Sequence, residues 1–232
     1  MGMCAWLGVS VYNVHFQGRV GFIIGTGALF LIGYGACIYF AARIFRLGRL
    51  RRDYNLGFLG ERAVGEELNR MMAKGYEVYH DVQFEGRPGS KNFNIDHVIV
   101  GPGGIFSVET KTRRKQVKKG SDSPRNIVEF DGNRLTFPWG SDDFGIKQAR
   151  ENAAHLRGWL QQAVGNKIEV IPILALPGWS VDRKGKGDVR VVSGREISSA
   201  FPATNSKAVL APDLIKRISF QLEQRCRNVE VE

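Results

Sequence analysis

The chain of 232 residues is poor in the features that mark several large classes of protein. It has only three cysteines, odd in number and far apart, so the sequence indicates no disulfide framework, and no Cys/His cluster has the spacing of a zinc site. Neither a GxxxxGK[ST] nor a GxGxxG loop is present, which disfavours nucleotide hydrolysis. No candidate histidine accompanies a Ser or Cys nucleophile, so a hydrolase triad is not indicated. Internal repeats and long low-complexity tracts are also lacking.

What the composition does offer is a core and an excess of positive charge. Hydrophobic residues make up 43% of the chain, enough to support a folded core. Lys and Arg total 33 against 23 Asp and Glu, which gives a net charge of +10. A basic balance favours polyanions or anionic lipid as partners, but it concerns attraction and not fold. The length fits one domain plus a membrane anchor.

Residues 20–42 form an uncharged, predominantly apolar run of 23 residues. A helix rises about 1.5 Å per residue, so this run can cross a hydrocarbon core of about 30 Å. No charged leading region and no clear small-residue cleavage site frame it, which argues against a signal peptide. The sequence therefore predicts a transmembrane helix over 20–42, preceded by a short N-terminal segment, 1–19. Within that segment, residues 4–14 are mildly apolar but too short to span, and they lie at the interface or are disordered.

A cluster of arginines follows the apolar run at once. Its members are Arg43, Arg46, Arg49, Arg51 and Arg52, whereas residues 1–19 carry only Arg19. The positive-inside rule predicts a single-pass protein of the plasma (inner) membrane, with its N-terminus outside and its soluble domain in the cytoplasm. Residues 43–56 form a basic juxtamembrane linker that could also contact lipid headgroups. The Gly21-x-x-x-Gly25 pattern is compatible with a homodimer through this helix, although glycine is common in spanning helices.

Residues 94–111 carry the chemistry, and they are typical of two strands joined by a turn at residues 101–104. Counting back from the turn, Val98 faces Ser107, and Asp96 faces Glu109. Side chains alternate along a strand, so Asp96, Glu109 and Lys111 project from one face. Two carboxylates about 5 Å apart repel, and a divalent cation between them turns that conflict into a binding site. Lys111 could then hold a water beside the metal, which points to metal-assisted hydrolysis of a phosphodiester.

The same run resembles the core of the nuclease-related domain (NERD), a branch of the PD-(D/E)xK nuclease superfamily. In that superfamily an aspartate, here Asp96, is followed one strand later by Glu-x-Lys, here residues 109–111. The resemblance extends upstream through residues 57–61 and Gly75-Tyr76, and downstream to Gln148. Ile95, instead of proline, precedes the aspartate, and a long insertion follows the lysine. The resemblance implies an α/β fold with a restriction-endonuclease-like mixed β-sheet core flanked by helices, here preceded by one transmembrane helix.

The resemblance also implies roles for two further residues. The first helix of the family supplies a carboxylate, and Glu61 occupies that place; Mg²⁺ or Mn²⁺ would then be held by Asp96, Glu109 and Glu61. Glu61 falls on the apolar face of a helix expected over 61–72, where a charge needs a partner, although it could instead cap the positive end of that helix. Gln148 fits a glutamine that lies beside the metal in related proteins. Its alternative is a place on a polar helix face.

Five cations follow the Glu-x-Lys motif closely and are candidate phosphate contacts: Arg113, Arg114, Lys115, Lys118 and Lys119. A solvated loop or the protection of a sheet edge by lysine would explain them equally well. No aromatic residue alternates with them, so this run does not indicate a platform on which single-stranded bases stack. By alternation, His97 faces away from Asp96, which favours a structural role for it.

The remaining elements complete one domain. A strand is expected over 75–82, pairing with the Asp96 strand. The core spans residues 57–165, with an insertion at about 112–138 that contains a hairpin turning at Asp131-Gly132. Residues 166–232 supply C-terminal strands and a closing helix. The further elements expected are a helix at 144–163, a strand at 168–176 that is interrupted or at an edge because of Pro172, a strand at 189–192 and an amphipathic helix at 211–225.

Two functions remain open, and a third is conceivable. The first is a membrane-anchored, divalent-metal-dependent nuclease, with DNA favoured over RNA as substrate. The second is a noncatalytic nuclease-fold module that binds nucleic acid or a protein partner at the membrane. In the third, the arginine cluster signals at a lipid surface and the carboxylates are structural. Metal dependence of cleavage separates the first two.

Overall fold

The computed structural model describes residues 2–85, 92–115, 126–202 and 210–226. The chain divides into two compact units, Met1–Asn55 and Leu56–Glu232. Of the predicted phosphate contacts, Lys118 and Lys119 lie outside the described residues.

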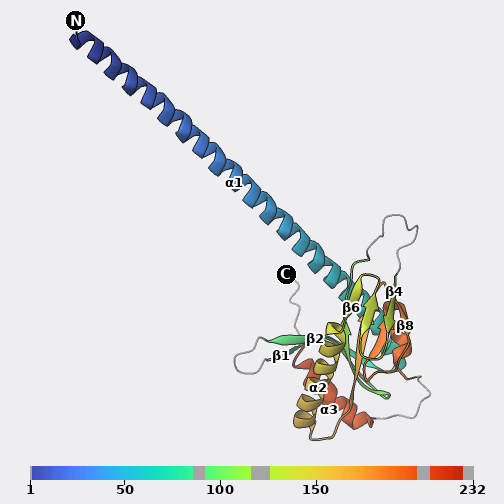
Figure 1. The fold of residues 1–232 in the computed structure, drawn as a ribbon. Helices are drawn as coiled ribbons and strands as arrows, with labels where there is room; N and C mark the ends of the chain where they lie inside the picture. Colours follow the sequence, from blue (N-terminus) through green and yellow to red (C-terminus); the bar gives the residue numbers. More distant parts are fainter. Residues whose placement is uncertain (1, 86–91, 116–125, 203–209, 227–232) are drawn as a thin grey trace. The chain divides into compact units, whose positions relative to one another are not determined.

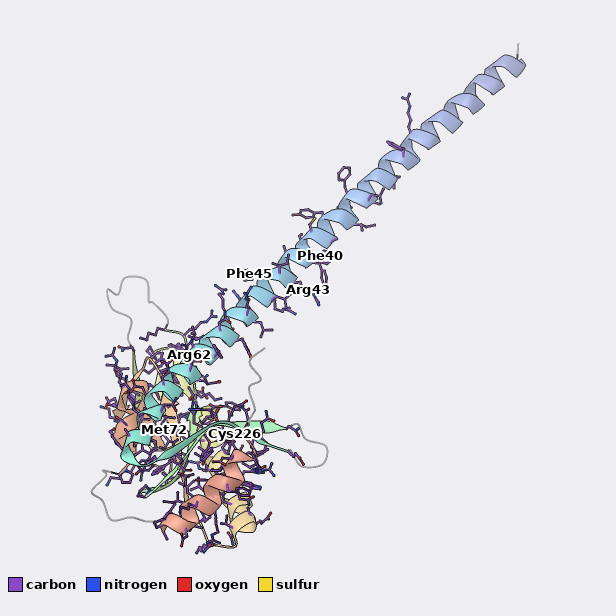
Figure 2. The ribbon with its side chains drawn as sticks, turned by 180° about the vertical axis from the view of Figure 1, so that it is seen from behind. Phe40, Arg43, Phe45, Arg62, Met72 and Cys226 are labelled. Carbon is purple, nitrogen blue, oxygen red and sulfur yellow. The ribbon has the colours of Figure 1, made fainter. Side chains whose placement is uncertain are left out.

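From Gly2 on, the first unit is helical and belongs to α1 (Gly2–Asn69). Among the described residues, one helix is long and apolar enough to cross a membrane, a test that a signal sequence near the N-terminus also passes. Large apolar side chains such as Phe40 and Phe45 are exposed and point away from the helix (Figure 2). The basic segment 43–56 is helical too, and so is the N-terminal segment from Gly2 on, where an interfacial or disordered stretch was expected. The first 55 residues contain no proline to interrupt the helix.

The second unit is built on a mixed five-stranded sheet, as predicted for the core. Its strands, in spatial order, are β1 (Glu77–Phe84), β2 (Phe93–Gly101), β3 (Gly104–Thr110), β7 (Val170–Leu176) and β9 (Arg190–Ser193). The pairs β1–β2 and β2–β3 are antiparallel, whereas β7 lies parallel to both β3 and β9.

The insertion and a later strand form a second, four-stranded sheet. Its order is β6 (Gly140–Asp142), β5 (Leu135–Phe137), β4 (Ile127–Phe130) and β8 (Ser180–Arg183). The hairpin predicted at Asp131-Gly132 is confirmed. The Asp131 carboxylate accepts the backbone N–H of Asn133 at 2.8 Å and of Arg134 at 2.7 Å, and Gly132 takes a φ of 108°. Strand β8 was not predicted, because its sequence Ser-Val-Asp-Arg resembles the charged loop that follows it.

Helices cover both faces of the main sheet. On one face, Val64, Leu68 and Met71, at and just beyond the end of α1, cluster with Phe106 and Ile173. The short η1 (Met72–Lys74) follows α1, and η2 (Gly194–Ala200) follows β9.

On the other face, α2 (Phe144–Val164) and α3 (Pro212–Glu223) lie side by side (Figure 1). Leu156 of α2 and Ile218 of α3 share a buried cluster with Ile105 of the sheet. The predicted helices at 144–163 and 211–225 are thereby confirmed.

The expectation for Pro172 needs a correction. Strand β7 is uninterrupted and lies between β3 and β9, not at the edge of the sheet. Pro172 is paired with Ser107 of β3, but on the other side β9 begins to pair only at Ile173. At Pro172, the side of β7 that faces β9 has no paired strand residue, so the missing N–H of the proline is tolerated there.

Candidate active site

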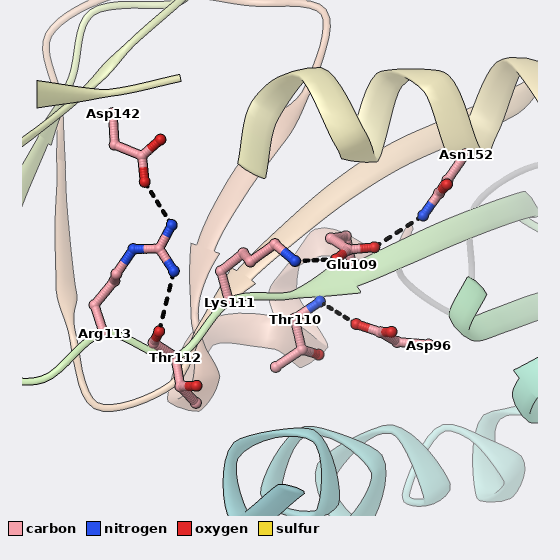
Figure 3. Close-up of polar contacts among 8 residues, drawn as sticks. All are labelled: Asp96, Glu109, Thr110, Lys111, Thr112, Arg113, Asp142 and Asn152. Atoms are coloured by element: carbon pink, nitrogen blue, oxygen red, sulfur yellow. Dashed lines mark hydrogen bonds and ion pairs between the residues drawn. The ribbon is translucent and has the colours of Figure 1, made fainter. Parts of the chain in front are cut away.

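The site lies where β2 and β3 diverge from each other. The predicted pairing of Val98 with Ser107 is confirmed, and the last pair of the ladder is His97 with Val108. One position further along, the Asp96 carboxylate accepts the backbone N–H of Thr110 at 2.7 Å (Figure 3). A side chain of one strand therefore replaces the next ladder hydrogen bond, and this fixes Asp96 against the end of β3.

Glu109 is the most buried charged group of the site, with 1% of its surface exposed. Its Oε1 lies 2.7 Å from Lys111 Nζ, and its Oε2 accepts a hydrogen bond of 2.8 Å from Asn152 Nδ2 of α2 (Figure 3). The backbone N–H of Lys111 donates to Ala175 O of β7 at 2.9 Å. Strand β3, strand β7 and helix α2 thus hold Glu109 and Lys111 together.

Burial dominates the electrostatics of the two carboxylates, and each lies near charges of both signs. Burial, and then the nearby charge of Asp96, raise the pKa of Glu109 from its usual 4.5 to about 7, although Lys111 opposes the shift. Burial likewise raises the pKa of Asp96, against the Thr110 N–H and Lys111, while Asp81 adds to the increase. A bound cation would favour the ionised form of both groups.

Glu61 approaches the same site from α1. Its side chain is exposed to solvent, yet partial burial and the charge of Asp96 raise its pKa, with Lys111 opposing. The approach depends on Gly60, because a Cβ at that position would overlap Thr112 Cγ2 and lie 3.2 Å from Pro177 Cγ. The glycine lets the helix come close to the chain segment that follows Lys111.

The chemistry of these donors fits a hard divalent cation, because carboxylate oxygens are what Mg²⁺ and Mn²⁺ prefer. Burial is the first cause of the raised pKa values of Asp96 and Glu109, and a bound cation would oppose both shifts. Within the described ranges, however, no three His, Cys, Asp or Glu side chains gather closely enough to hold an ion. Assignment of Asp96, Glu109 and Glu61 as metal ligands therefore stays a prediction.

Gln148 and Asn152 lie one turn apart on α2, and both line a groove of about 800 Å³. Gln148 is half-buried, whereas Asn152 is buried and makes the hydrogen bond to Glu109. From the sequence, Gln148 was expected to supply the amide that lies next to the carboxylates. The spacing of four residues was the available signal for Asn152, since residues i and i+4 share a helix face.

The described cations after Lys111 differ in their surroundings. Arg113 forms an ion pair with Asp142 of β6 and donates to Thr112 O at 3.3 Å (Figure 3). The backbone carbonyl of Arg113 accepts the Trp179 Nε1–H at 3.1 Å. A phosphate would have to compete with Asp142 for this guanidinium, whereas Arg114 and Lys115 are exposed. The phosphate-contact role of all five cations remains a prediction.

Two histidines lie on the opposite side of β2 from Asp96, as alternation predicts for His97. His97 Nδ1 is 2.8 Å from His80 Nδ1, and His80 Nε2 is 3.0 Å from Asn69 Oδ1. Burial, and then the proximity of His80, lower the pKa of His97 to about 3. Burial also lowers the pKa of His80, which favours the neutral form of both rings. The two rings link the end of α1 to β1 and β2.

A mixed sheet flanked by helices, with two carboxylates and a lysine at one strand end, defines a nuclease-like α/β domain. The family model of the nuclease-related domain (NERD) matches residues 56–177, and the chain belongs to this family. Comparison with curated proteins gives no match, and neither does comparison with solved structures.

Proposed function

We propose that the protein is a membrane-anchored nuclease that depends on a divalent metal ion and hydrolyses phosphodiester bonds of nucleic acid, with DNA favoured over RNA. One observation carries the proposal: a buried Glu109–Lys111 pair next to Asp96, at a strand end that Glu61 also approaches. Membership of the nuclease-related family supports the reaction class.

Each residue has a role that follows from its position. Asp96, Glu109 and Glu61 would hold Mg²⁺ or Mn²⁺, which supplies a Lewis acid and lowers the pKa of bound water. The Lys111 ammonium orients the attacking water and stabilises the negative charge that develops on the phosphate. Asn152 keeps the Glu109 carboxylate in place through its 2.8 Å hydrogen bond, and Gln148 orients groups at the mouth of the groove.

Anchoring and charge fit the same proposal. An apolar N-terminal helix long enough to span a membrane would anchor the nuclease-like unit at its surface, and the arginine cluster favours the cytoplasmic side. The net charge of +10 favours encounter with a polyanion, in a salt-dependent manner. Degradation of nucleic acid at the cell envelope is the setting that these two features favour.

Cleavage by the purified full-length chain tests the proposal. We expect strand cleavage with Mg²⁺ or Mn²⁺ and none with a chelator. Asp96→Ala and Lys111→Ala should each lower the rate by at least about 100-fold while leaving the circular dichroism spectrum unchanged. Lys167→Ala, an exposed lysine outside the site, is the matched control and should retain full activity. Cleavage that survives both site substitutions would refute the assignment.

A second candidate is a noncatalytic module that binds nucleic acid or a partner protein at the membrane. One observation favours it: both Glu109 oxygens already have partners, Lys111 and Asn152, so the site is satisfied without an ion. Binding of nucleic acid that weakens with salt, together with the absence of cleavage under any metal, would support this candidate over the nuclease.

A further inference from the structure

A pocket of about 740 Å³ lies beside the outer strands of the main sheet, and its lining combines aromatic and amide side chains. The aromatic rings are Phe84 of β1, Phe93 of β2 and Trp159 of α2. Phe84 and Phe93 are stacked with centroids 5.7 Å apart, and Trp159 meets Phe84 edge to face at 5.5 Å. Five amide side chains also line the pocket: Gln83, Asn92, Asn94, Gln221 and Gln224.

Arg225 adds a fixed guanidinium to these rings. Its Cζ lies 4.9 Å from the ring centroid of Trp159 and 5.3 Å from that of Phe84, which is a cation–π arrangement. The backbone holds it there: Gln83 N donates to Arg225 O at 3.1 Å, and Val82 forms a bridge with Cys226. Figure 2 labels Cys226 at this place, where the chain leaves α3 beside the strands.

The lining identifies the chemical class of ligand. Phe84 is buried and packs against Phe93 and Trp159, which are half-buried. These two half-buried rings and the guanidinium plane suit the stacking of a nucleobase, and Asn and Gln amides suit the donor and acceptor edge of a base. Asp81 and Glu85 also line the pocket, which disfavours a phosphate there and favours an uncharged ring. The volume falls in the range of pockets for small organic groups, about 300–1,000 Å³.

The pocket is adjacent to the candidate active site. Asn94 lies two residues before Asp96 on β2, and its amide donates a hydrogen bond to Asp81, whose charge raises the pKa of Asp96. Phe93 and Asn94 also line the 800 Å³ groove, which reaches Asn152, the partner of Glu109. A strand with a phosphate at Lys111 can therefore extend along the groove and place a base in the pocket.

We propose that this pocket binds an unpaired base of the nucleic-acid strand that is cut at Lys111, so that the substrate is single-stranded or locally unpaired. The inference rests on the proposed nuclease function for the position of the phosphate, but the binding of the base does not require cleavage. A paired base would have to leave its duplex to enter, and the unpairing disfavours double strands.

Binding of full-length Lys111→Ala protein to labelled oligonucleotides, measured by fluorescence anisotropy, tests the proposal. The probes are a single strand, an abasic strand of the same length and the corresponding duplex. We expect the abasic strand and the duplex to bind at least about fivefold more weakly than the single strand, because stacking of one base is worth about 1–3 kcal/mol.

Variants of the pocket extend the test. Trp159→Leu keeps an apolar side chain but removes the aromatic face, and Gln224→Ala changes an exposed amide that does not support the core. Each should weaken binding of the base-bearing strand and leave the abasic strand unaffected. The matched controls are Trp139→Leu and Gln161→Ala, which lie outside the pocket lining and should change neither affinity.

Equal affinity for the base-bearing and abasic strands, a preference for the duplex, or no binding of any probe would overturn the proposal. An unchanged affinity in both pocket variants would do so as well. These outcomes are independent of the cleavage assay. A base preference without metal-dependent cleavage would contradict the nuclease proposal but not this inference. Cleavage without a base preference would contradict this inference but not the nuclease proposal.

Discussion

Glu109 is under opposing influences that decide how the site behaves without a cation. Lys111 and Asn152 stabilise the ionised carboxylate, while burial and Asp96 disfavour it, and the net effect is a pKa raised to about 7. Between pH 4.5 and 7 the folded state therefore keeps a proton on Glu109 that the unfolded state loses. The contribution of Glu109 to the free energy of unfolding consequently falls as the pH rises through this window, whereas His97, with its lowered pKa, contributes in the opposite direction.

The first prediction concerns this pH dependence. Without divalent metal, the raised pKa of Glu109 should add a decline in stability between about pH 4.5 and 7 that Glu109→Gln lacks. Thermal unfolding followed by near-ultraviolet circular dichroism measures this decline as the difference between the two proteins. Glu66→Gln, an exposed helix position, should show the same pH profile as the wild type. A pH profile in Glu109→Gln that runs parallel to the wild type would contradict the assignment.

The second prediction concerns Asn152. Asn152→Ala removes the donor to Glu109 Oε2 inside the core, and a buried acceptor without its partner costs about 1–3 kcal/mol. Chemical denaturation at pH 8 should show a loss of this size. Asn133→Ala, in an exposed turn, should change stability by less than about 0.5 kcal/mol. Equal effects of the two substitutions would show that the amide does not support Glu109.

For individual residues, the sequence predicted the positions that follow from side-chain alternation along a strand. It missed the contacts that come from elements distant in sequence. Asp96, Glu109 and Lys111 follow from counting along two strands that share a short turn. The partner of Glu109 comes from a helix more than 40 residues later, and the residue that packs there, Asn152 instead of Gln148, is set by the rotation of that helix. Arg225 reaches its aromatic partners through the pairing of α3's end with β1, which no local pattern contains.

Among the elements, the β2–β3 hairpin was predictable in detail because its register is set by the turn at residues 101–104. Helices α2 and α3 and the hairpin at Asp131-Gly132 were also predictable, from periodicity and turn chemistry. The second sheet was not, since β8 is short and charged and finds its place only by pairing in parallel with β4. The middle position of β7 escaped prediction for a related reason, because β9 pairs with only part of it.

The third prediction concerns the approach of α1 to the strand end. Gly60→Ala places a methyl group against the side chains of Thr112 and Pro177, so either Thr112 must rotate or the helix must move outward and carry Glu61 with it. We expect a loss of about 1–3 kcal/mol in unfolding free energy and a decrease in metal-dependent cleavage. Denaturation and the cleavage assay provide the two measurements.

Gly57→Ala is the matched control on the same helix. A Cβ at Gly57 would meet nothing within 4 Å, so alanine should stabilise the helix by up to about 1 kcal/mol and preserve cleavage. If both substitutions behaved alike, close packing at Gly60 would not be what positions Glu61.

For the whole molecule, the fourth prediction concerns orientation in the membrane. The arginines after the apolar run favour an N-terminus outside and residues 56–232 in the cytoplasm. An N-terminal epitope tag should therefore be accessible to antibody on intact cells, and a C-terminal tag only after permeabilisation. The reverse pattern would contradict the topology, and recovery of the protein in the soluble fraction would contradict the anchor.

The whole account rests on a divalent ion binding beside Lys111, and Mn²⁺ binding followed by electron paramagnetic resonance tests this most directly. We predict saturable binding by the full-length protein at pH 8, lost in Asp96→Asn and retained in Asp143→Asn, whose carboxylate lies at an exposed ion pair with Lys147. Wild-type protein that binds no Mn²⁺, or binding that persists unchanged in Asp96→Asn, would contradict the account.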